Sequence, residues 1–298
     1  MLQGHVTSFA GAQLERYTSI KAHDETEGAV LQFLFNEHGV LSLAARSVHF
    51  MLRRALTISH VEHPLMTNLN CMVFVDRGAS LLVAGNQKCM LRIDVTKGSV
   101  VEEIDTEAEY TMMKHSRYIC AATSKGSVDF LDTITFQVMK SWQAHTASIS
   151  DMEMSGNSLI TCGRAVRPHG PAMLENLAKV YDLKAMLQMP PIPFPGGAAH
   201  VQIHPKLSTT CILAAPNGQL QVIDVVNHNT SNMTFLGFVI THFIMSSSGS
   251  LWAIADNDNT LHLWGSPNKL MNINEVVKLP EYADDAEHVQ QISIDEDV

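Results

Sequence analysis

The sequence predicts an all-β protein built from repeated small sheets, because one short pattern recurs six times in 298 residues. The pattern alternates apolar and polar residues and then turns sharply, as in the run 261–264, which Gly265 closes. The steps between equivalent positions are 41, 38, 50, 42 and 41 residues, and a blade of a WD-type β-propeller repeats roughly every 40 to 45 residues. The period therefore predicts a WD-repeat propeller. The six runs are 50–53, 91–94, 129–132, 179–182, 221–224 and 261–264.

A short apolar strand and a polar turn precede each of these runs. Short, evenly spaced strands with Gly, Asn or Asp at the turns are typical of all-β repeats. The strands are rich in small residues, and we expect them to lie innermost, next to the central channel, where bulky side chains would force the sheets apart. They are predicted at 41–45, 81–85, 118–122, 159–163, 210–214 and 251–255.

The two ends of the chain predict how the ring closes. Six units run from about residue 26 to residue 278, and strand-like segments remain at about 5–20 and 288–295. Neither segment can form a sheet alone, so we expect them to pair in a seventh blade and remove the open sheet edges. The prediction is a seven-bladed WD-repeat β-propeller that occupies residues 1–298 as a single domain.

Composition narrows the class of protein. The N-terminus lacks a signal-peptide pattern, and the most apolar stretch, 233–245, is too short and too polar to span a bilayer. We therefore expect a cytoplasmic protein that does not contact a membrane.

Five cysteines without a C-x-x-C pair favour free, buried thiols over a disulfide frame or a zinc site. A net charge of −10 makes direct binding to an RNA backbone unfavourable.

Several residues are predicted to stabilise the blades rather than to bind a partner. His145 stands where WD repeats often place a Gly-His pair before the first strand of a blade. We expect it to join a hydrogen-bond network with the hydroxyl of Thr161 and the aromatic side chain of Tyr181. The ends of the recurring runs are marked by Asp94, Asp132, Asp182, Asp224 and Trp264.

Catalytic and metal-binding patterns are weak. In the run 60–63, His60 and His63 flank Glu62, which on a helix could begin a metal site, but the run follows a strand and no third ligand is near in sequence. Paired carboxylates occur only in polar segments, where solvated charge is the ordinary interpretation. No phosphate-binding loop or nucleophile elbow is present. The sequence thus predicts no catalytic residue, metal or cofactor in this chain.

The step of 50 residues indicates an insertion at 164–177, between the second and third strands of one blade. Long loops on rigid scaffolds often carry binding residues, although an insertion without function is equally consistent with the sequence. Loop position, charge or expected aromatic exposure gives five candidate partner-binding residues. These are Arg164, Arg167, His169, Trp142 and Arg54.

Some local strings are more specific than a generic propeller. They include the runs 126–132, 147–152 and 179–183, and above all the proline-rich run 190–199 followed by His204-Pro205. From about residue 26 to 266 the chain resembles the N-terminal WD-repeat propeller of the larger, catalytic subunit of the fungal poly(A)-nuclease deadenylase.

The resemblance implies a place in cytoplasmic mRNA deadenylation, including localisation to P-bodies. In that family the propeller precedes a linker, an inactive ubiquitin-hydrolase-like domain and a poly(A)-specific 3′-exoribonuclease that uses a divalent metal, expected to be Mg²⁺. The propeller itself would be a non-catalytic scaffold. It would dock the pseudokinase-containing regulatory subunit and help to position the nuclease on tails coated by poly(A)-binding protein, so that contact with poly(A) RNA is indirect.

Two alternatives remain at this point. One is an adaptor propeller of an unrelated complex, such as a vesicle coat or a ubiquitin ligase. The other is a propeller enzyme with a metal or acid–base site at the central channel, which would need converging His, Asp or Glu residues where this chain mostly has Ala, Ser and Cys.

Overall fold

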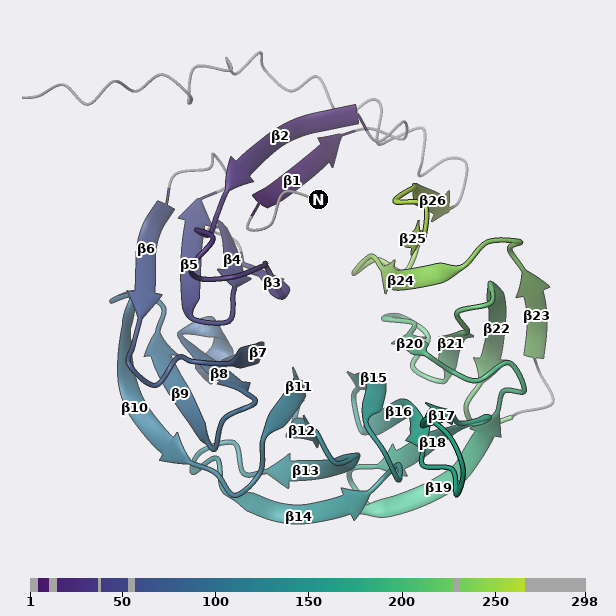
Figure 1. Ribbon diagram of the computed structural model, residues 1–298. Coiled ribbons are helices and arrows are strands. Elements are labelled where there is room, and N and C mark those ends of the chain that lie inside the picture. The colour runs from purple at the N-terminus through teal and green to yellow at the C-terminus, as the bar shows by residue number, and fades with distance from the viewer. Residues whose placement is uncertain (1–4, 11–14, 37–38, 53–56, 228–230, 266–298) are drawn as a thin grey trace, which may run out of the picture.

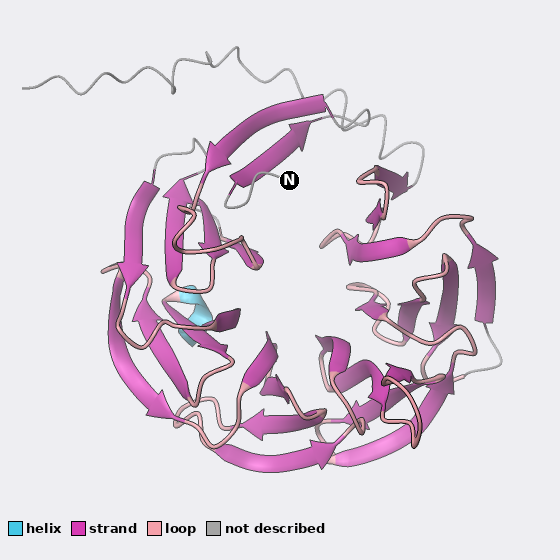
Figure 2. Ribbon diagram, in the orientation of Figure 1, coloured by secondary structure: helices cyan, strands magenta, loops and turns pink. Residues whose placement is uncertain are grey.

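The computed structural model describes residues 5–10, 15–36, 39–52, 57–227 and 231–265. In this part of the chain the elements are β-strands, apart from the 3-10 turn η1 (Asp76–Gly78) between two of them (Figure 2). Six sheets stand around a common centre as the blades of a propeller (Figure 1). None of the described segments forms a helix long and apolar enough to cross a membrane.

Each blade is an antiparallel meander in which neighbouring strands follow one another along the chain. The first blade consists of β3 (Gln32–Phe35), β4 (Gly39–Leu43), β5 (Ser47–Leu52) and β6 (Thr57–Glu62). The second consists of β7 (Leu69–Val75), β8 (Ser80–Gly85), β9 (Cys89–Asp94) and β10 (Ser99–Asp105). The third consists of β11 (Tyr110–His115), β12 (Ile119–Thr123), β13 (Ser127–Leu131) and β14 (Val138–Gln143).

The remaining blades follow the same order, with one addition. The fourth consists of β15 (Ile149–Ser155), β16 (Ser158–Ala165), the short β17 (Met173–Leu174), β18 (Leu177–Asp182) and β19 (Leu187–Pro193). The fifth consists of β20 (His200–Ile203), β21 (Thr210–Ala214), β22 (Gln219–Asp224) and β23 (Ser231–Phe235). The sixth consists of β24 (Ile240–Met245), β25 (Leu251–Asp256) and β26 (Leu261–Gly265). The six predicted recurring runs therefore mark β5, β9, β13, β18, β22 and β26.

The strands rich in small residues are not the innermost ones, so that prediction is wrong. The first strand of each blade, from β3 to β24, lies at the centre of the ring, and consecutive first strands contact one another (Figure 1). The small-residue strands are second in each sheet. All residues of β8 and β12 are buried, because each of these strands has a neighbour on both edges and packs against adjacent blades on its faces. Small side chains suit that enclosure.

Polar side chains join adjacent first strands across the blade boundaries. The Gln32 amide donates to the Met72 carbonyl at 2.9 Å and accepts from the Met72 N–H at 2.7 Å. The carboxylate of Asp151 accepts from the N–H of Val201 at 2.9 Å. Such contacts satisfy backbone groups at the inner sheet edges, which would otherwise be open.

The N-terminal segment forms two strands, β1 (His5–Ala10) and β2 (Glu15–Lys21), where the sequence predicted strand-like character at 5–20. They pair antiparallel in a separate two-stranded sheet. Figure 1 shows this sheet in the ring between the first and sixth blades. The described residues thus form six blades and a two-stranded sheet, and the predicted count of seven blades is not confirmed. The predicted partner strand at 288–295 lies outside the described residues.

Candidate functional site

The dipeptide Ala-His stands in the segments that lead into the first and the fourth blade, as Ala22-His23 and Ala144-His145. Both histidine side chains are buried, with 1% of each residue exposed. A buried imidazole must satisfy two ring nitrogens with polar partners. Each of these histidines is therefore the centre of a polar cluster.

In the fourth blade, His145 Nε2 lies 3.0 Å from the hydroxyl of Thr161 on β16, as the sequence predicted. Its Nδ1 faces the Glu175 carboxylate at 3.2 Å, and Lys179 pairs with the same carboxylate at 3.3 Å. A Cβ at position 163 would collide with the His145 ring, so Gly163 permits this close approach. Burial lowers the pKa of His145. The imidazole is held neutral beside a balanced ion pair.

Tyr181 does not join this hydrogen-bond network, although the sequence predicted that it would. Its ring is buried and stacks on Trp142, with centroids 5.0 Å apart. Trp142 also contacts Phe130 edge-on at 6.3 Å and receives Lys140 over its ring. It is partly buried against the core between the third and fourth blades, so the free exposure on which its selection as a binding residue rested is absent.

The four aspartates that mark the recurring runs have a local structural role. The Oδ1 atom of Asp94 accepts from the N–H groups of residues 96 and 97 at 2.9 and 3.0 Å. Asp132, Asp182 and Asp224 each accept from the backbone two and three residues later in the same way. Each aspartate therefore stabilises the turn between the third and fourth strands. Trp264 lies on β26 opposite Trp252, and 45% of it is exposed.

The insertion at 164–177 has a defined path at its base. Arg164 and Ala165 pair with Leu174 and Met173 of β17, and the backbone of Arg164 also bonds to residues 147 and 148. Arg164, Arg167 and His169 are exposed. The structure therefore brings three of the five predicted binding residues onto one hairpin, beside β17 in Figure 1. Arg54, the fifth, lies outside the described residues.

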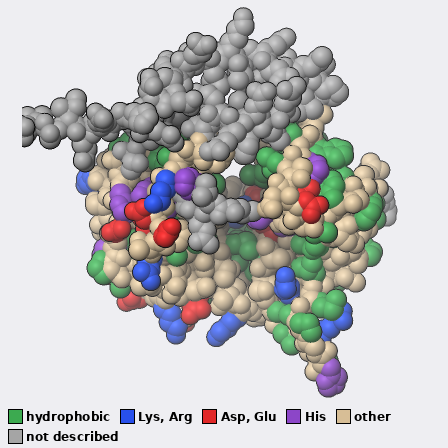
Figure 3. All heavy atoms as spheres, turned by 45° about the horizontal axis from the view of Figure 1, so that its top comes forward, with side chains coloured by type: hydrophobic (Ala, Val, Ile, Leu, Met, Phe, Trp, Pro, Cys, Tyr) green, Lys and Arg blue, Asp and Glu red, His purple; other side chains and the backbone are tan. Residues whose placement is uncertain are grey.

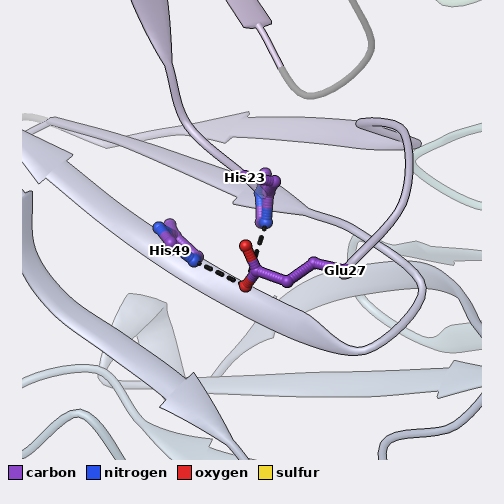
Figure 4. Close-up of side chains that lie close together, drawn as sticks. All are labelled: His23, Glu27 and His49. Carbon is purple, nitrogen blue, oxygen red and sulfur yellow. Dashed lines mark hydrogen bonds and ion pairs between the residues drawn. The ribbon is translucent and has the colours of Figure 1, made fainter. Parts of the chain in front are cut away.

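The cluster in the first blade is larger and was missed by the sequence analysis. His23 Nδ1 and Nε2 lie 2.9 and 2.8 Å from the hydroxyls of Ser47 and Ser42. The adjacent Glu27 carboxylate, with 6% of the residue exposed, lies 3.7 Å from His23 Nδ1. Figure 4 shows His23 and His49 directed at this one carboxylate.

Two cross-strand histidines share the same Glu27 oxygen. His49 on β5 and His60 on β6 are direct partners in the sheet, and their Nε2 atoms lie 3.0 and 2.9 Å from Glu27 Oε1. His60 Nε2 is also 3.2 Å from Glu62 Oε1. His60 and Glu62 belong to the run that the sequence singled out, whereas His63 pairs instead with Glu103 at 3.4 Å.

The surroundings of the cluster determine which of its side chains are ionised. Burial by itself would raise the pKa of Glu27, but hydrogen bonds from the Ser47 hydroxyl, the Asp24 amide and His49 lower it to about 2. Burial lowers the pKa of His23 to about 4, and the neighbouring His49 adds to this effect. Burial also lowers the pKa of His49. At neutral pH the site therefore holds an ionised carboxylate beside the uncharged imidazoles of His23 and His49.

Comparison with known proteins identifies the family. The family model described as PAN2 N-terminal matches residues 2–265. The chain belongs to this PAN2 N-terminal family. It is 48% identical over 282 residues to the PAN2-PAN3 deadenylation complex catalytic subunit PAN2 of Coccidioides immitis, covering 94% of this chain. A protein with the same description from Aspergillus terreus is 49% identical over 283 residues, again covering 94% of this chain.

A solved structure, the Pan2 WD40 domain of Neurospora crassa, has a TM-score of 0.85 and 44% sequence identity. The match covers 89% of this chain and 84% of that one. The chain is therefore a WD40 propeller. A computationally designed protein, Ika8, is similar in fold alone, with a TM-score of 0.64 and 14% identity over 89% of this chain and 81% of its own.

The chain spans 23% of the Coccidioides PAN2 subunit and 24% of the Aspergillus terreus one. It corresponds to the N-terminal WD40 region of a PAN2 catalytic subunit. Membership in the PAN2 N-terminal family supports the resemblance found in the sequence and argues against an adaptor from an unrelated coat or ubiquitin-ligase complex.

Proposed function

We propose that this chain is the docking propeller of a PAN2-PAN3-type deadenylation complex. It binds a regulatory subunit of the PAN3 kind and so helps to bring the nuclease part of the same protein to mRNA tails. The support is the family assignment together with the relatives, which are described as catalytic subunits of such complexes.

The observation that carries the docking role is the cationic hairpin of the fourth blade, formed by residues 164–177. The chain as a whole has a net charge of −10, yet this hairpin exposes Arg164, Arg167 and His169. Its base is fixed by pairing with β17 and by backbone bonds to residues 147 and 148. A rigidly based cationic projection on an acidic scaffold suits an acidic segment of a protein partner, and arginines are frequent interface anchors.

The test is calorimetric titration of the chain with the pseudokinase regulatory subunit, at two salt concentrations. The variant Arg164→Ala/Arg167→Ala is expected to weaken binding by at least about tenfold, since two interface arginines are lost. The matched control is Arg117→Ala/Lys206→Ala, which removes two exposed charges from turns between first and second strands, at the opposite end of the blades. Equal affinity in the two double variants would overturn the role of the hairpin.

The wider setting follows from the same proposal. We place the complex in the cytoplasm, at P-bodies, where it acts on tails coated by poly(A)-binding protein. The nuclease part of the full-length protein would supply the divalent metal, Mg²⁺, for hydrolysis. Because of the net charge of −10, contact with poly(A) RNA is expected to pass through protein partners. An electrophoretic mobility assay of this chain with poly(A) RNA should show no complex at physiological salt.

We also propose that the ring closes as seven blades, with β1 and β2 completed by the C-terminal segment at 288–295. The blades on both sides of the two-stranded sheet expose large apolar side chains. Phe35 of β3 is 72% exposed, and Trp264 of β26 is 45% exposed. Removal of residues 286–298 should lower the melting temperature by several degrees. An unchanged melting temperature would leave six blades and a free two-stranded sheet.

A further inference from the structure

The first blade holds a set of metal-ligand types that no function proposed above requires. Three potential ligands, Glu27, His60 and Glu62, offer atoms that all lie within 4.8 Å of one another. The His49 Nε2 atom lies 3.0 Å from Glu27 Oε1 on the enclosed side of the cluster. In the space-filling view, histidine and acidic side chains lie together with Lys and Arg side chains on the side of the ring that carries the first two blades (Figure 3).

We propose that Glu27, His60 and Glu62 form a binding site for a zinc-class divalent cation on the first blade, with the fourth position left to a solvent ligand. The ligands come from the segment before β3 and from β6. A bound ion would tie the chain that enters the propeller to the outermost strand of the first blade. The ion would have a structural role, independent of any nuclease metal elsewhere in the full-length protein.

The distances fit this chemistry. Zinc binds imidazole nitrogen and carboxylate oxygen at about 2.0 to 2.2 Å, so neighbouring ligand atoms in a tetrahedral site lie about 3.3 Å apart. Here the Glu27 oxygen is 2.9 Å from His60 Nε2, and His60 Nε2 is 3.2 Å from the Glu62 oxygen. One imidazole and two carboxylates, with the fourth position open to solvent, are a donor set that zinc accepts.

The charges of the site are compatible with a bound cation. Glu27 is buried, and among the described residues its ion-pair partners are histidines rather than lysine or arginine. Hydrogen bonds from the Asp24 amide and from His49 stabilise the ionised carboxylate without supplying a fixed positive charge. The comparable Glu175 of the fourth blade has Lys179 at 3.3 Å as a fixed cation. A divalent ion would balance Glu27 and Glu62 together.

His23 is excluded from the ligand set by its own hydrogen bonds. Both of its nitrogens are engaged by the hydroxyls of Ser42 and Ser47. The Ser47 hydroxyl also bonds to Glu27. His23 and Ser47 thus act as positioning residues for the Glu27 carboxylate, in the way that neighbours outside a metal's ligand set orient its ligands.

The site has one enclosed side and one open side. The side chains of Glu27 and His49 are 7% and 12% exposed, whereas those of His60 and Glu62 are 41% and 65% exposed. An ion can therefore enter from solvent past His60 and Glu62 without opening the core. The two exposed ligands are also free to move by the small amount needed to close a tetrahedron.

The test is calorimetric titration of chelator-treated protein with Zn²⁺, followed by Co²⁺ titration with visible absorption as the reporter of tetrahedral coordination. The whole chain is expected to bind one equivalent of Zn²⁺ and to show a higher melting temperature in its presence. His60→Ala and Glu62→Gln should each weaken binding at least tenfold. Both changes are at exposed positions, so the fold is expected to persist, with the melting temperature of the metal-free variants as the check.

The matched control is His63→Ala, three residues further on, whose imidazole pairs with Glu103 outside the cluster. It should leave Zn²⁺ affinity and the Co²⁺ spectrum unchanged. Absence of binding at high micromolar Zn²⁺ would overturn the proposal, and so would binding that His60→Ala and Glu62→Gln leave unaltered. In either case the cluster would be a hydrogen-bond network only. Docking of the regulatory subunit is measured separately and does not depend on this result.

Discussion

The first and fourth blades are both preceded by the dipeptide Ala-His, and the buried histidine that it supplies has different surroundings in each. In the fourth blade, His145 faces one hydroxyl and one carboxylate, and Lys179 balances that carboxylate. In the first blade, His23 is satisfied by two hydroxyls, and the neighbouring Glu27 has only imidazoles as ion-pair partners among the described residues.

The two clusters differ in the group that faces the carboxylate, and this difference gives the two buried histidines different surroundings. A lysine provides a permanent charge, and in the cluster of the fourth blade it balances the Glu175 carboxylate. Neutral imidazoles provide hydrogen bonds and lone pairs but no charge, so the cluster of the first blade retains the capacity to accept a cation. Whether a cluster can accept a cation therefore depends on the group that faces its carboxylate and not on the buried histidine.

The largest expected effect comes from Glu27→Ala. The ionised carboxylate is stabilised by hydrogen bonds in the native state, with its pKa lowered to about 2. Loss of these bonds should reduce the free energy of unfolding by about 3 kcal/mol at pH 7, as measured by urea denaturation. The exposed neighbour Glu25 provides the control, and Glu25→Ala should change stability by less than about 0.5 kcal/mol. A loss for Glu27→Ala no larger than that of the control would mean that the first cluster contributes nothing to stability.

A fall in pH should destabilise the fold through His200 and His145 before it protonates Glu27. Burial lowers the pKa of His200 from 6.5 to about 4 and also lowers that of His145. Below pH 6.5 these histidines are protonated in the unfolded chain but not yet in the native state. The free energy of unfolding therefore falls as the pH is lowered from 6.5 to 4. The contribution of His200 is on the order of 2 kcal/mol.

This pH dependence can be measured by urea denaturation at intervals between pH 7 and 4. His200→Gln should flatten the curve, while Glu27, whose pKa is about 2, stays ionised throughout this window. A variant curve as steep as that of the original protein would place the acid sensitivity elsewhere.

Thr161→Val tests the hydroxyl in the fourth blade with almost no change of shape. It leaves His145 Nε2 buried without its partner and should cost roughly 1 to 2 kcal/mol. Ser47→Ala in the first blade should cost at least as much, because the Ser47 hydroxyl is a partner of both His23 Nδ1 and the Glu27 carboxylate. Urea denaturation of both variants checks this order, and the reverse order would contradict the assigned partners.

Lys179→Met makes the fourth blade resemble the first, and its expected effect is the smallest. Removing the cation near Glu175 should cost about 1 kcal/mol, because the pair is only partly enclosed. The pKa of His145 should rise, since Lys179 contributes to lowering it. Titration of the His145 resonance by NMR reports this change. The exposed Lys184→Met is the control, and an equal shift in both variants would show a general charge effect rather than a local one.

Much of the fold could be predicted because it depends on local pattern. The aspartates at the ends of the recurring runs each stabilise a turn within three residues of themselves, so a few consecutive residues suffice to predict their role. They are Asp94, Asp132, Asp182 and Asp224. Trp142 shows where such prediction ends. Its sequence position suggested exposure, but its ring packs on Tyr181, which is 39 residues away and belongs to the next blade.

The sequence by itself determined the β-propeller repeat, the turns that close each third strand, the partnership of His145 with Thr161 and the resemblance to the deadenylase family. These features rest on alternation, turn chemistry and motif strings, all of which are short-range. Only the tertiary structure decided which strands are innermost and that Glu27, His49 and His60 meet. Glu27 lies 33 residues before His60, and their encounter depends on the register that pairs β5 with β6 and on the path of the chain into the first blade. Long-range strand pairing is a collective result of packing, so no local window of the sequence contains it.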